Sequence, residues 1–179
     1  MTITLIGYRA TGKTTLARLL AERLGWDWVD ADVEIERRAG KSIARIFAED
    51  GEATFRELEV AAIANLCRRE RLVVAAGGGA PLREENRRAM RAAGTVVWLR
   101  ASAQTVHARM LDDATTAGRR PNLTKRGGLA EIVELLALRE PIYQEVADVT
   151  IDTEGKTPEA LTAEILGRLQ PTPNAEDSA

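Results

Sequence analysis

A glycine-flanked loop near the start of the chain has the residue types and spacing of a phosphate-binding site. Residues 7–14 read Gly-Tyr-Arg-Ala-Thr-Gly-Lys-Thr, which matches the pattern Gly-x-x-x-x-Gly-Lys-Ser/Thr throughout. The two glycines allow the backbone to curl, so that successive N–H groups point toward an anion. Lys13 can reach the outer phosphates of a nucleoside triphosphate, and the Thr14 hydroxyl can bind Mg²⁺. The alternative is a glycine-rich turn that binds nothing, and the strand and helix patterns that flank the loop argue against it.

Two carboxylates lie at the end of the second predicted strand. Asp30 and Asp32 are two positions apart, so their side chains point the same way for as long as the strand geometry lasts. One carboxylate could hold a metal-bound water molecule while the other faces an acceptor molecule. The alternative is an ordinary strand exit with an aspartate that caps the next helix. The presence of the phosphate loop favours the functional interpretation.

A triple glycine, residues 77–79, directly follows the apolar residues 72–76. Three consecutive glycines are too permissive to form a stable helix or strand, and many ordinary loops contain such a run. At the end of an apolar strand, however, the run indicates that the backbone approaches a ligand closely and offers N–H groups to it.

Several arginines are candidates for binding an anionic substrate, although each has an ordinary alternative. Arg56 lies beside the apolar stripe of a predicted helix with Glu59 three residues later, and a solvated salt bridge would explain that pair. Arg120 lies in the polar stretch 112–128, whose length is typical of an active-site lid, the alternative being a disordered basic loop. Arg139 lies on the following helix, where an exposed position is the alternative.

The hydrophobic pattern predicts an α/β fold in three layers, with a central five-stranded parallel sheet flanked by helices. Strands are expected at residues 2–6, 26–30, 72–76, 95–99 and 149–151. Helices are expected at residues 13–24, 33–39, 43–50, 52–69, 83–93, 102–111, 129–146 (interrupted at Pro141) and 158–169. Ligands of such sheets bind at the carboxyl ends of the strands, where the phosphate loop, the aspartate pair and the triple glycine all fall.

The composition is that of a single domain without a membrane segment. The formal net charge of the 179 residues is −2, which gives no general electrostatic reason to bind nucleic acid or an anionic membrane. Cys67 is the only cysteine and is expected to be a small buried residue in a reducing compartment, while the three tryptophans are expected in the core. No apolar run approaches ~20 residues. We expect a cytoplasmic protein with one domain at residues 1–170 and a disordered tail at 171–179.

Beyond the phosphate loop, the motifs resemble those of the shikimate kinases, which are small P-loop enzymes of the nucleoside-monophosphate-kinase fold group. The resemblance runs from about residue 2 to residue 169, and the phosphate loop by itself is shared by many families. The distinguishing matches are residues 30–32, 42–47, 51–52, 55–59, 77–79, 120–121 and 138–143. Their order and spacing are specific to this family.

The resemblance implies ATP-dependent phosphorylation of the 3-hydroxyl of shikimate by a monomeric enzyme that uses Mg²⁺. The implied nucleotide-binding residues are Gly7, Ala10, Thr11, Gly12, Lys13, Thr14, Thr15, Arg109, Arg120, Lys156 and Pro158. The implied substrate-binding residues are Asp32, Arg56, Glu59, Gly77, Gly78, Gly79 and Arg139. Three of the latter, Asp32, Arg56 and Glu59, lie in or beside an acceptor-binding segment expected at about residues 33–61, and the lid is expected at about residues 112–128.

The resemblance also implies individual roles. The catalytic residues would be Lys13, Asp32 and Arg120, and the metal-binding residues would be Thr14 and Asp30. Asp30 would hold the metal through water, and Asp32 would orient the acceptor hydroxyl. Two arginines, Arg56 and Arg139, would hold the shikimate carboxylate together with the glycine backbone.

The chain departs from the family pattern at Ala10 and in the lid. Ala10 stands where the family usually has a third loop glycine, and a positive φ there would cost about 1 kcal/mol. The lid stretch is longer than usual.

Two other functions stay open on the residues alone. One is another small-molecule kinase of the fold group, such as a gluconate or nucleoside-monophosphate kinase. A nucleobase acceptor would favour stacking aromatic residues, for which Phe55 is the obvious candidate. The other is a catalytically inactive ATP-binding module, against which the intact phosphate loop, aspartates and arginines argue.

Overall fold

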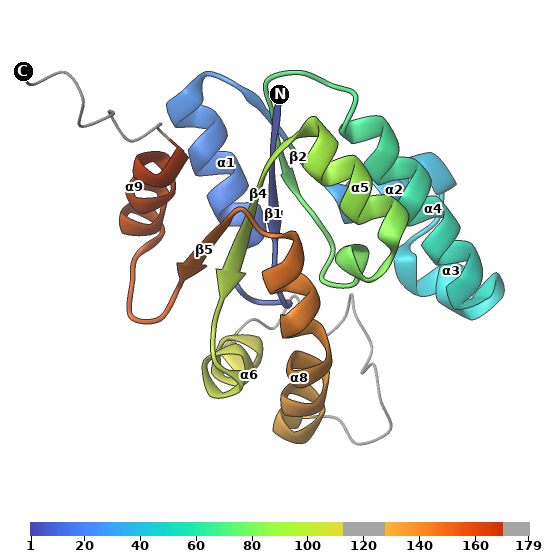
Figure 1. Cartoon of the computed structure of the whole chain (residues 1–179). Helices are drawn as coiled ribbons and strands as arrows, with labels where there is room; N and C mark the ends of the chain where they lie inside the picture. Colours follow the sequence, from blue (N-terminus) through green and yellow to red (C-terminus); the bar gives the residue numbers. More distant parts are fainter. Residues whose placement is uncertain (113–127, 170–179) are drawn as a thin grey trace, which may run out of the picture.

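The computed structural model describes residues 1–112 and 128–169, in which strands and helices alternate along the chain. In chain order the described elements are β1 (Thr2–Ile6), α1 (Lys13–Leu24), β2 (Asp27–Asp30), α2 (Ala31–Ala39), α3 (Ile43–Glu49), α4 (Gly51–Leu66), β3 (Leu72–Ala75), the 3₁₀ helix η1 (Ala80–Leu82), α5 (Glu84–Ala93), β4 (Gly94–Arg100), α6 (Ala103–Asp112), α8 (Gly128–Val146), β5 (Val149–Asp152) and α9 (Pro158–Leu169). Figure 1 shows the sheet between two layers of helices.

The described strands form one parallel sheet of five strands in the order β2-β3-β1-β4-β5. β1 is the central strand, and its Thr2 is in register with Leu72 of β3 and Gly94 of β4. Because all five strands run in the same direction, their carboxyl ends lie along one edge of the sheet. The α/β fold class and the five-stranded sheet that the sequence predicted are therefore confirmed.

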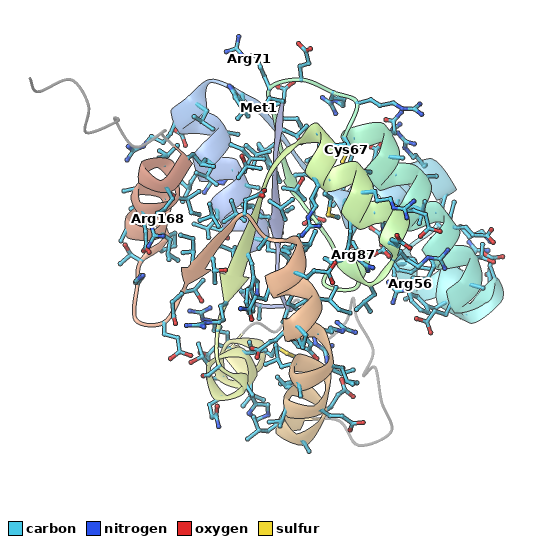
Figure 2. All side chains as sticks on the ribbon, viewed as in Figure 1. Met1, Arg56, Cys67, Arg71, Arg87 and Arg168 are labelled. Carbon is cyan, nitrogen blue, oxygen red and sulfur yellow. The ribbon has the colours of Figure 1, made fainter. Side chains whose placement is uncertain are left out.

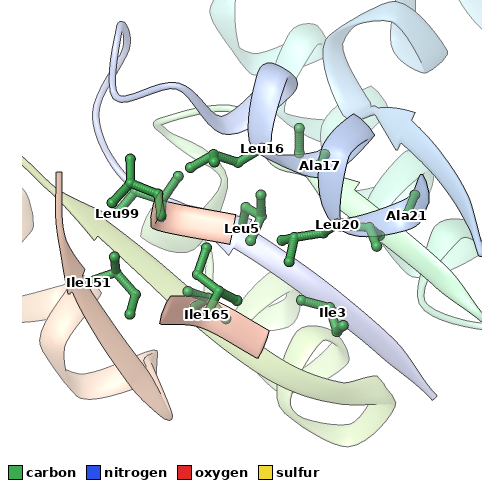
Figure 3. Packing of buried hydrophobic residues seen from close by; sticks show 13 residues of the cluster. Ile3, Leu5, Leu16, Ala17, Leu20, Ala21, Leu99, Ile151 and Ile165 are labelled. Carbon is green, nitrogen blue, oxygen red and sulfur yellow. The ribbon is translucent and has the colours of Figure 1, made fainter. Parts of the chain in front are cut away.

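One face of the sheet is covered by α1 and α9. Ile3 and Leu5 of β1 point to this side and pack among Leu16 and Leu20 of α1 and Ile165 of α9 (Figure 3). These five side chains are almost completely buried, and burying a leucine or isoleucine contributes about 1.5–3 kcal/mol to the free energy of unfolding. The apolar layer thereby fixes the amino-terminal end of α1 at the carboxyl edge of the sheet.

The opposite face is covered mainly by α4, α5 and α8. Ile6 of β1 and Val96 of β4 point to this side, where they lie in one cluster with Met90 of α5 and Tyr143 of α8. Cys67 packs at the margin of this cluster and is half-buried (Figure 2), and its burial raises the pKa of the thiol to about 11. This packing places α8 against the same sheet that carries the phosphate loop.

Helices α2, α3 and α4 have a small core of their own beside the main sheet. Ile35, Ile46 and Phe55 are buried in it, and the ring centroids of Phe47 and Phe55 lie 4.7 Å apart. The Ser42 side chain caps α3 by accepting a hydrogen bond from its backbone. These helices cover the residues that the sequence assigned to an acceptor-binding segment.

Three details differ from the expectations. α2 begins at Ala31, two residues early, because Asp30 caps it. α8 runs through Pro141 without interruption, since the helix has buried residues both before and after the proline that hold it against the sheet. Trp28 is 39% exposed because it lies on the edge strand β2, whereas Trp98 on β4 is buried as expected.

Two expectations fall outside the described residues. They are most of the lid stretch, including Arg120, and the tail at residues 171–179. Within the described ranges, no helix is long and apolar enough to cross a membrane.

Candidate active site

The phosphate loop connects β1 to the first turn of α1 at the carboxyl edge of the sheet. Gly7 and Gly12 have φ angles of 136° and 89°, which residues with side chains rarely adopt. Space also excludes a side chain at Gly7, because a Cβ there would lie 2.5 Å from the carbonyl oxygen of Leu99. The two glycines therefore let the loop pass close to β4 and present its backbone at the amino-terminal end of α1, which carries a partial positive charge.

Lys13, the first residue of α1, folds back over this loop. Its Nζ donates hydrogen bonds to the carbonyl oxygens of Gly7 at 2.9 Å and Tyr8 at 2.6 Å. Thr11 is buried and donates from its hydroxyl to the same Tyr8 oxygen at 2.8 Å, whereas Thr15 is exposed. The loop thus holds the ammonium group inside the curl that would surround a phosphate.

The side chains of Thr14 and Asp30 are hydrogen-bonded to each other. Thr14 Oγ1 donates to Asp30 Oδ2 at 2.7 Å, while Asp30 Oδ1 accepts from the backbone N–H of Asp32 at 3.0 Å. Asp30 therefore caps α2, as the ordinary alternative predicted, and it also lies against the phosphate-loop hydroxyl. Strand geometry ends at Asp30, and Asp32 lies in the first turn of α2 rather than on the strand.

Asp32, Glu59 and the triple glycine come together beside this loop. A Cβ at Gly77 would lie 2.9 Å from Asp32 Oδ1 and 3.2 Å from Glu59 Oε1, so these carboxylates occupy the space a side chain would need. The buried Glu59 accepts a hydrogen bond from Arg56 Nη1 at 2.9 Å. Burial raises the pKa of Glu59 above its ordinary value, and the charges of Arg56 and Arg139 oppose that shift. The cluster thus pairs acidic groups with two cations.

Arg56 reaches from α4 to the last glycine of the run. A Cβ at Gly79 would lie 2.5 Å from Arg56 Nη1 and 3.1 Å from its Cζ. Figure 2 shows Arg56 on the α4 side of the molecule, away from Met1 and Arg71 at the opposite edge of the sheet. The guanidinium therefore lies directly against the Gly79 backbone.

Arg139 is a buried residue of α8, and the exposed position that was its alternative is excluded. It is 8% exposed, and its Cζ lies 5.5 Å from the centroid of the Tyr8 ring. A Cβ at Gly78 would lie 3.7 Å from Arg139 Nη1. One turn further along α8, the Tyr143 hydroxyl donates to the Gly78 carbonyl at 2.5 Å, and burial raises the pKa of Tyr143 to about 12. α8 therefore supports both the phosphate loop and the triple glycine.

The remaining nucleotide-binding candidates lie on the β5 side of the sheet. Arg109 of α6 donates to the side chain and carbonyl of Thr153 at 3.0 and 2.9 Å, and to the Ala10 carbonyl at 3.4 Å. Lys156 is exposed and forms a 2.6 Å ion pair with Glu164, and α9 begins at the exposed Pro158. The structure therefore connects Arg109 with the phosphate loop, whereas the ion pair of Lys156 is with Glu164 of α9.

Known proteins resemble this chain along nearly its whole length. A family model described as shikimate kinase matches residues 9–170. The chain belongs to the shikimate kinase family. Curated shikimate kinases from Rhodopirellula baltica and Pseudomonas savastanoi pv. phaseolicola are 46% and 45% identical to it over 90% and 94% of its length, and the matches cover 87% and 96% of those proteins.

Solved structures agree with this family membership. A shikimate kinase from Acinetobacter baumannii, in complex with shikimate, matches with a TM-score of 0.87 at 36% identity and covers 93% of this chain and 91% of that one. A gluconokinase from Sinorhizobium meliloti matches with a TM-score of 0.54 at 16% identity over 94% of each chain. The second match reflects a shared fold alone.

Within this shikimate kinase fold, sequence reasoning missed several residues beside the site. Tyr8 and Arg9 occupy positions that the loop pattern leaves free, so nothing in the pattern marks them. Glu131, which contacts Arg9, lies 122 residues away and gave no signal. Tyr143 could have been found, because it follows Arg139 by four residues and therefore lies on the same face of a helix.

Proposed function

We propose that this chain transfers the γ-phosphoryl group of ATP to the 3-hydroxyl of shikimate, giving shikimate 3-phosphate and ADP. The observation that carries the proposal is the chain of hydrogen bonds from Thr14 through Asp30 to Asp32, which joins the phosphate loop to the acidic and basic cluster at the same edge of the sheet. We also propose that the enzyme is a cytoplasmic monomer, and the lone cysteine suits a reducing compartment.

On the nucleotide side, the loop backbone and Lys13 would bind the phosphates. The Thr14 hydroxyl and the Asp30 carboxylate are hard oxygen donors, which suit Mg²⁺, and the described residues include no group of three or more His, Cys, Asp and Glu that could form a cage. Mg²⁺ usually takes only one or two protein oxygens beside phosphate oxygens and water, so the donor set fits. When bound, the ion neutralises charge on the transferring phosphoryl group.

On the acceptor side, Arg56 and Arg139 would bind the carboxylate of shikimate. A guanidinium matches a carboxylate with two parallel hydrogen bonds, and the backbone of Gly78 and Gly79 lies beside both arginines. Glu59 holds Arg56 in place from its buried position. The ring hydroxyls then face the side of the cluster formed by Asp32, since a carboxylate accepts hydrogen bonds from hydroxyl groups.

Asp32 would orient the attacking hydroxyl and accept its proton late in the reaction. Phosphoryl transfer proceeds through a loose transition state, so the hydroxyl can keep its proton until bond formation is advanced. A carboxylate is a far weaker base than an alkoxide, so it does not deprotonate an alcohol to a useful extent beforehand. Positioning is therefore the larger part of the proposed role.

A nucleobase acceptor is not favoured by this arrangement. Phe55, the stacking candidate, is buried in the small core of α2, α3 and α4 and packs against Phe47. Its ring faces apolar neighbours and the Arg56 guanidinium. A ring so placed is not available to stack on a base.

The proposed activity is tested by measuring ADP release with three acceptors, namely shikimate, gluconate and AMP, in a coupled assay with Mg²⁺ and ATP. We expect turnover with shikimate to exceed turnover with the other two, and the product to be shikimate 3-phosphate. Preferred use of gluconate or AMP would overturn the assignment of the acceptor, and no turnover with any acceptor would favour the inactive ATP-binding module.

Substitution of Ala10 by glycine is expected to tighten ATP binding by up to about fivefold. Ala10 has a φ of 60°, which strains a residue with a side chain by about 1 kcal/mol. Alanine favours a negative φ, and a loop in which residue 10 adopts one loses its curl. Glycine adopts a positive φ without this penalty. Calorimetric titration with ATP measures the change, with Ala10→Val as the opposite control. A clear loss of affinity in Ala10→Gly would show that the loop has adapted to alanine.

Substitution of Gly79 by alanine is expected to raise KM for shikimate about tenfold without unfolding the protein. The backbone suits alanine, since φ is −93°, but the new Cβ would displace the end of the Arg56 side chain. Gly167→Ala on α9 is the matched control, because a Cβ there meets no atom within 4 Å. Steady-state kinetics and thermal unfolding separate the two effects, and an unchanged KM in Gly79→Ala would remove Arg56 from the acceptor site.

A further inference from the structure

A buried ion pair connects the phosphate loop with the first turn of α8. Arg9 Nη2 lies 2.7 Å from Glu131 Oε1, and the two side chains are 7% and 0% exposed. The residues are 122 positions apart in the chain, so the contact depends on the complete fold. No role in binding phosphate has been assigned to the side chain of Arg9, which points to α8.

The ring of Tyr8 lies close to both Arg9 of this pair and Arg139. The Cζ atoms of Arg9 and Arg139 are 5.6 and 5.5 Å from the ring centroid, both within the distance at which a cation is attracted to an aromatic ring. Tyr8 is itself buried, in a cluster with Ile132 and Leu136 of α8. A shift of the ring would therefore change its attraction to both guanidinium groups.

Glu131 and Arg139 lie on the same side of α8. They are eight residues apart, a little more than two turns, and both are buried. The helix therefore touches the phosphate loop at two points, at Arg9 through Glu131 and at Tyr8 through Arg139. The position of the Arg139 guanidinium depends on how α8 is seated at both points.

We propose that Arg9 and Glu131 are positioning residues for the acceptor. Their ion pair seats the first turn of α8 against the phosphate loop and, through the Tyr8 ring, holds the Arg139 guanidinium where it binds the shikimate carboxylate. This inference rests on the proposed function, because it concerns the same carboxylate.

A positioning role accounts for the ion pair better than a purely stabilising role does. Buried ion pairs are costly to desolvate, and apolar replacements of similar volume are often as stable. What such a pair supplies is a defined geometry, because a guanidinium and a carboxylate meet in few orientations. Here the pair fixes the position of α8, which carries Arg139, relative to the phosphate loop. The two must be aligned for phosphoryl transfer in the proposed reaction.

The test compares shikimate with shikimate carboxamide, in which a neutral amide replaces the carboxylate. The measured quantity is the ratio of kcat/KM for the two compounds in Arg9→Met, Glu131→Gln and the double variant. Arg88→Gln is the control, because Arg88 forms an exposed ion pair with Glu84 on α5, outside the acceptor-binding segment. Thermal unfolding is recorded for each variant.

We expect the ratio to fall about fivefold in Arg9→Met and in Glu131→Gln, and no further in the double variant, because coupled residues act as one unit. The control should keep the wild-type ratio. Glu131→Gln keeps the size of the side chain and decides the question if Arg9→Met does not fold.

An equal loss with both compounds, which leaves the ratio at its wild-type value, would overturn the inference and reduce the pair to a structural contact. That outcome leaves the proposed function intact, since wild-type protein would still prefer shikimate. A wild-type protein that does not phosphorylate shikimate would instead overturn the proposed function, and this inference with it.

Discussion

Replacing Lys13 with methionine is expected to lower kcat for phosphoryl transfer by at least about 100-fold while the protein still folds. Lys13 is the one cation that the described phosphate loop holds inside its own curl, through hydrogen bonds to the Gly7 and Tyr8 carbonyls. Removing a single preorganised donor to a developing negative charge costs about 10²–10³ in rate. Methionine keeps the length of the side chain but cannot interact with the phosphates.

Some loss of stability is also expected in this variant, because the two carbonyl oxygens lose a buried donor. Circular dichroism and thermal unfolding measure that loss, and ADP release measures turnover. Lys41→Met is the matched control, since Lys41 pairs with Glu49 and Asp50 and contacts no part of the phosphate loop in the described structure. Near-normal turnover in Lys13→Met would contradict the assignment of the phosphate loop.

Replacing Arg139 with alanine is expected to raise KM for shikimate by roughly 10- to 100-fold, because one charge-assisted hydrogen bond contributes about 1.5–3 kcal/mol. Arg139 should matter more than Arg56, since its side chain is 8% exposed against 17% and a buried ion pair with the substrate is screened less by water. KM for ATP should barely change, because Arg139 is not assigned to the nucleotide.

The variant Arg139→Lys should be nearly as impaired as Arg139→Ala. An ammonium group is a single point of charge and cannot reproduce the planar fork of a guanidinium. Full rescue by lysine would mean that charge alone is needed at this position.

Shikimate carboxamide shows whether the carboxylate itself is the group bound. Wild-type protein should prefer shikimate strongly, and Arg139→Ala should lose most of that preference. Arg88→Ala, on the exposed surface of α5, is the control and should behave as wild type. If Arg139→Ala discriminates the two compounds as strongly as wild type does, the carboxylate is bound elsewhere.

The parts of the site that could be predicted from the sequence are those that local spacing determines. Gly7, Gly12, Lys13 and Thr14 lie within one short loop, so their relative positions follow from the backbone that the glycines allow. The alternation of apolar strands with amphipathic helices likewise determines a parallel sheet with helices on both faces. The carboxyl edge of that sheet could then be named as the site.

The parts that could not be predicted depend on contacts between distant residues. The burial of Arg139 follows from the seating of α8 against Tyr8, and no periodicity in α8 separates this arginine from an exposed one. The pairing of Arg9 with Glu131 could not be predicted from the sequence either, because the two residues are far apart in the chain. The exposure of Trp28 could not be predicted either. It depends on the position of β2 at the edge of the sheet, and the local sequence does not reveal the strand order.

The two-sided bonding of Asp30 has a consequence for how substitutions at this site combine. One carboxylate oxygen accepts a hydrogen bond from Thr14 and the other accepts from the backbone of Asp32, so the same side chain is a shared partner of the hydroxyl proposed to bind Mg²⁺ and the residue proposed to orient the acceptor. Residues that share a partner are epistatic, and the free-energy effects of their substitutions do not add. If the proposed roles hold, a variant of Asp30 is therefore expected to perturb the use of both substrates, and its loss of turnover would not measure metal binding alone.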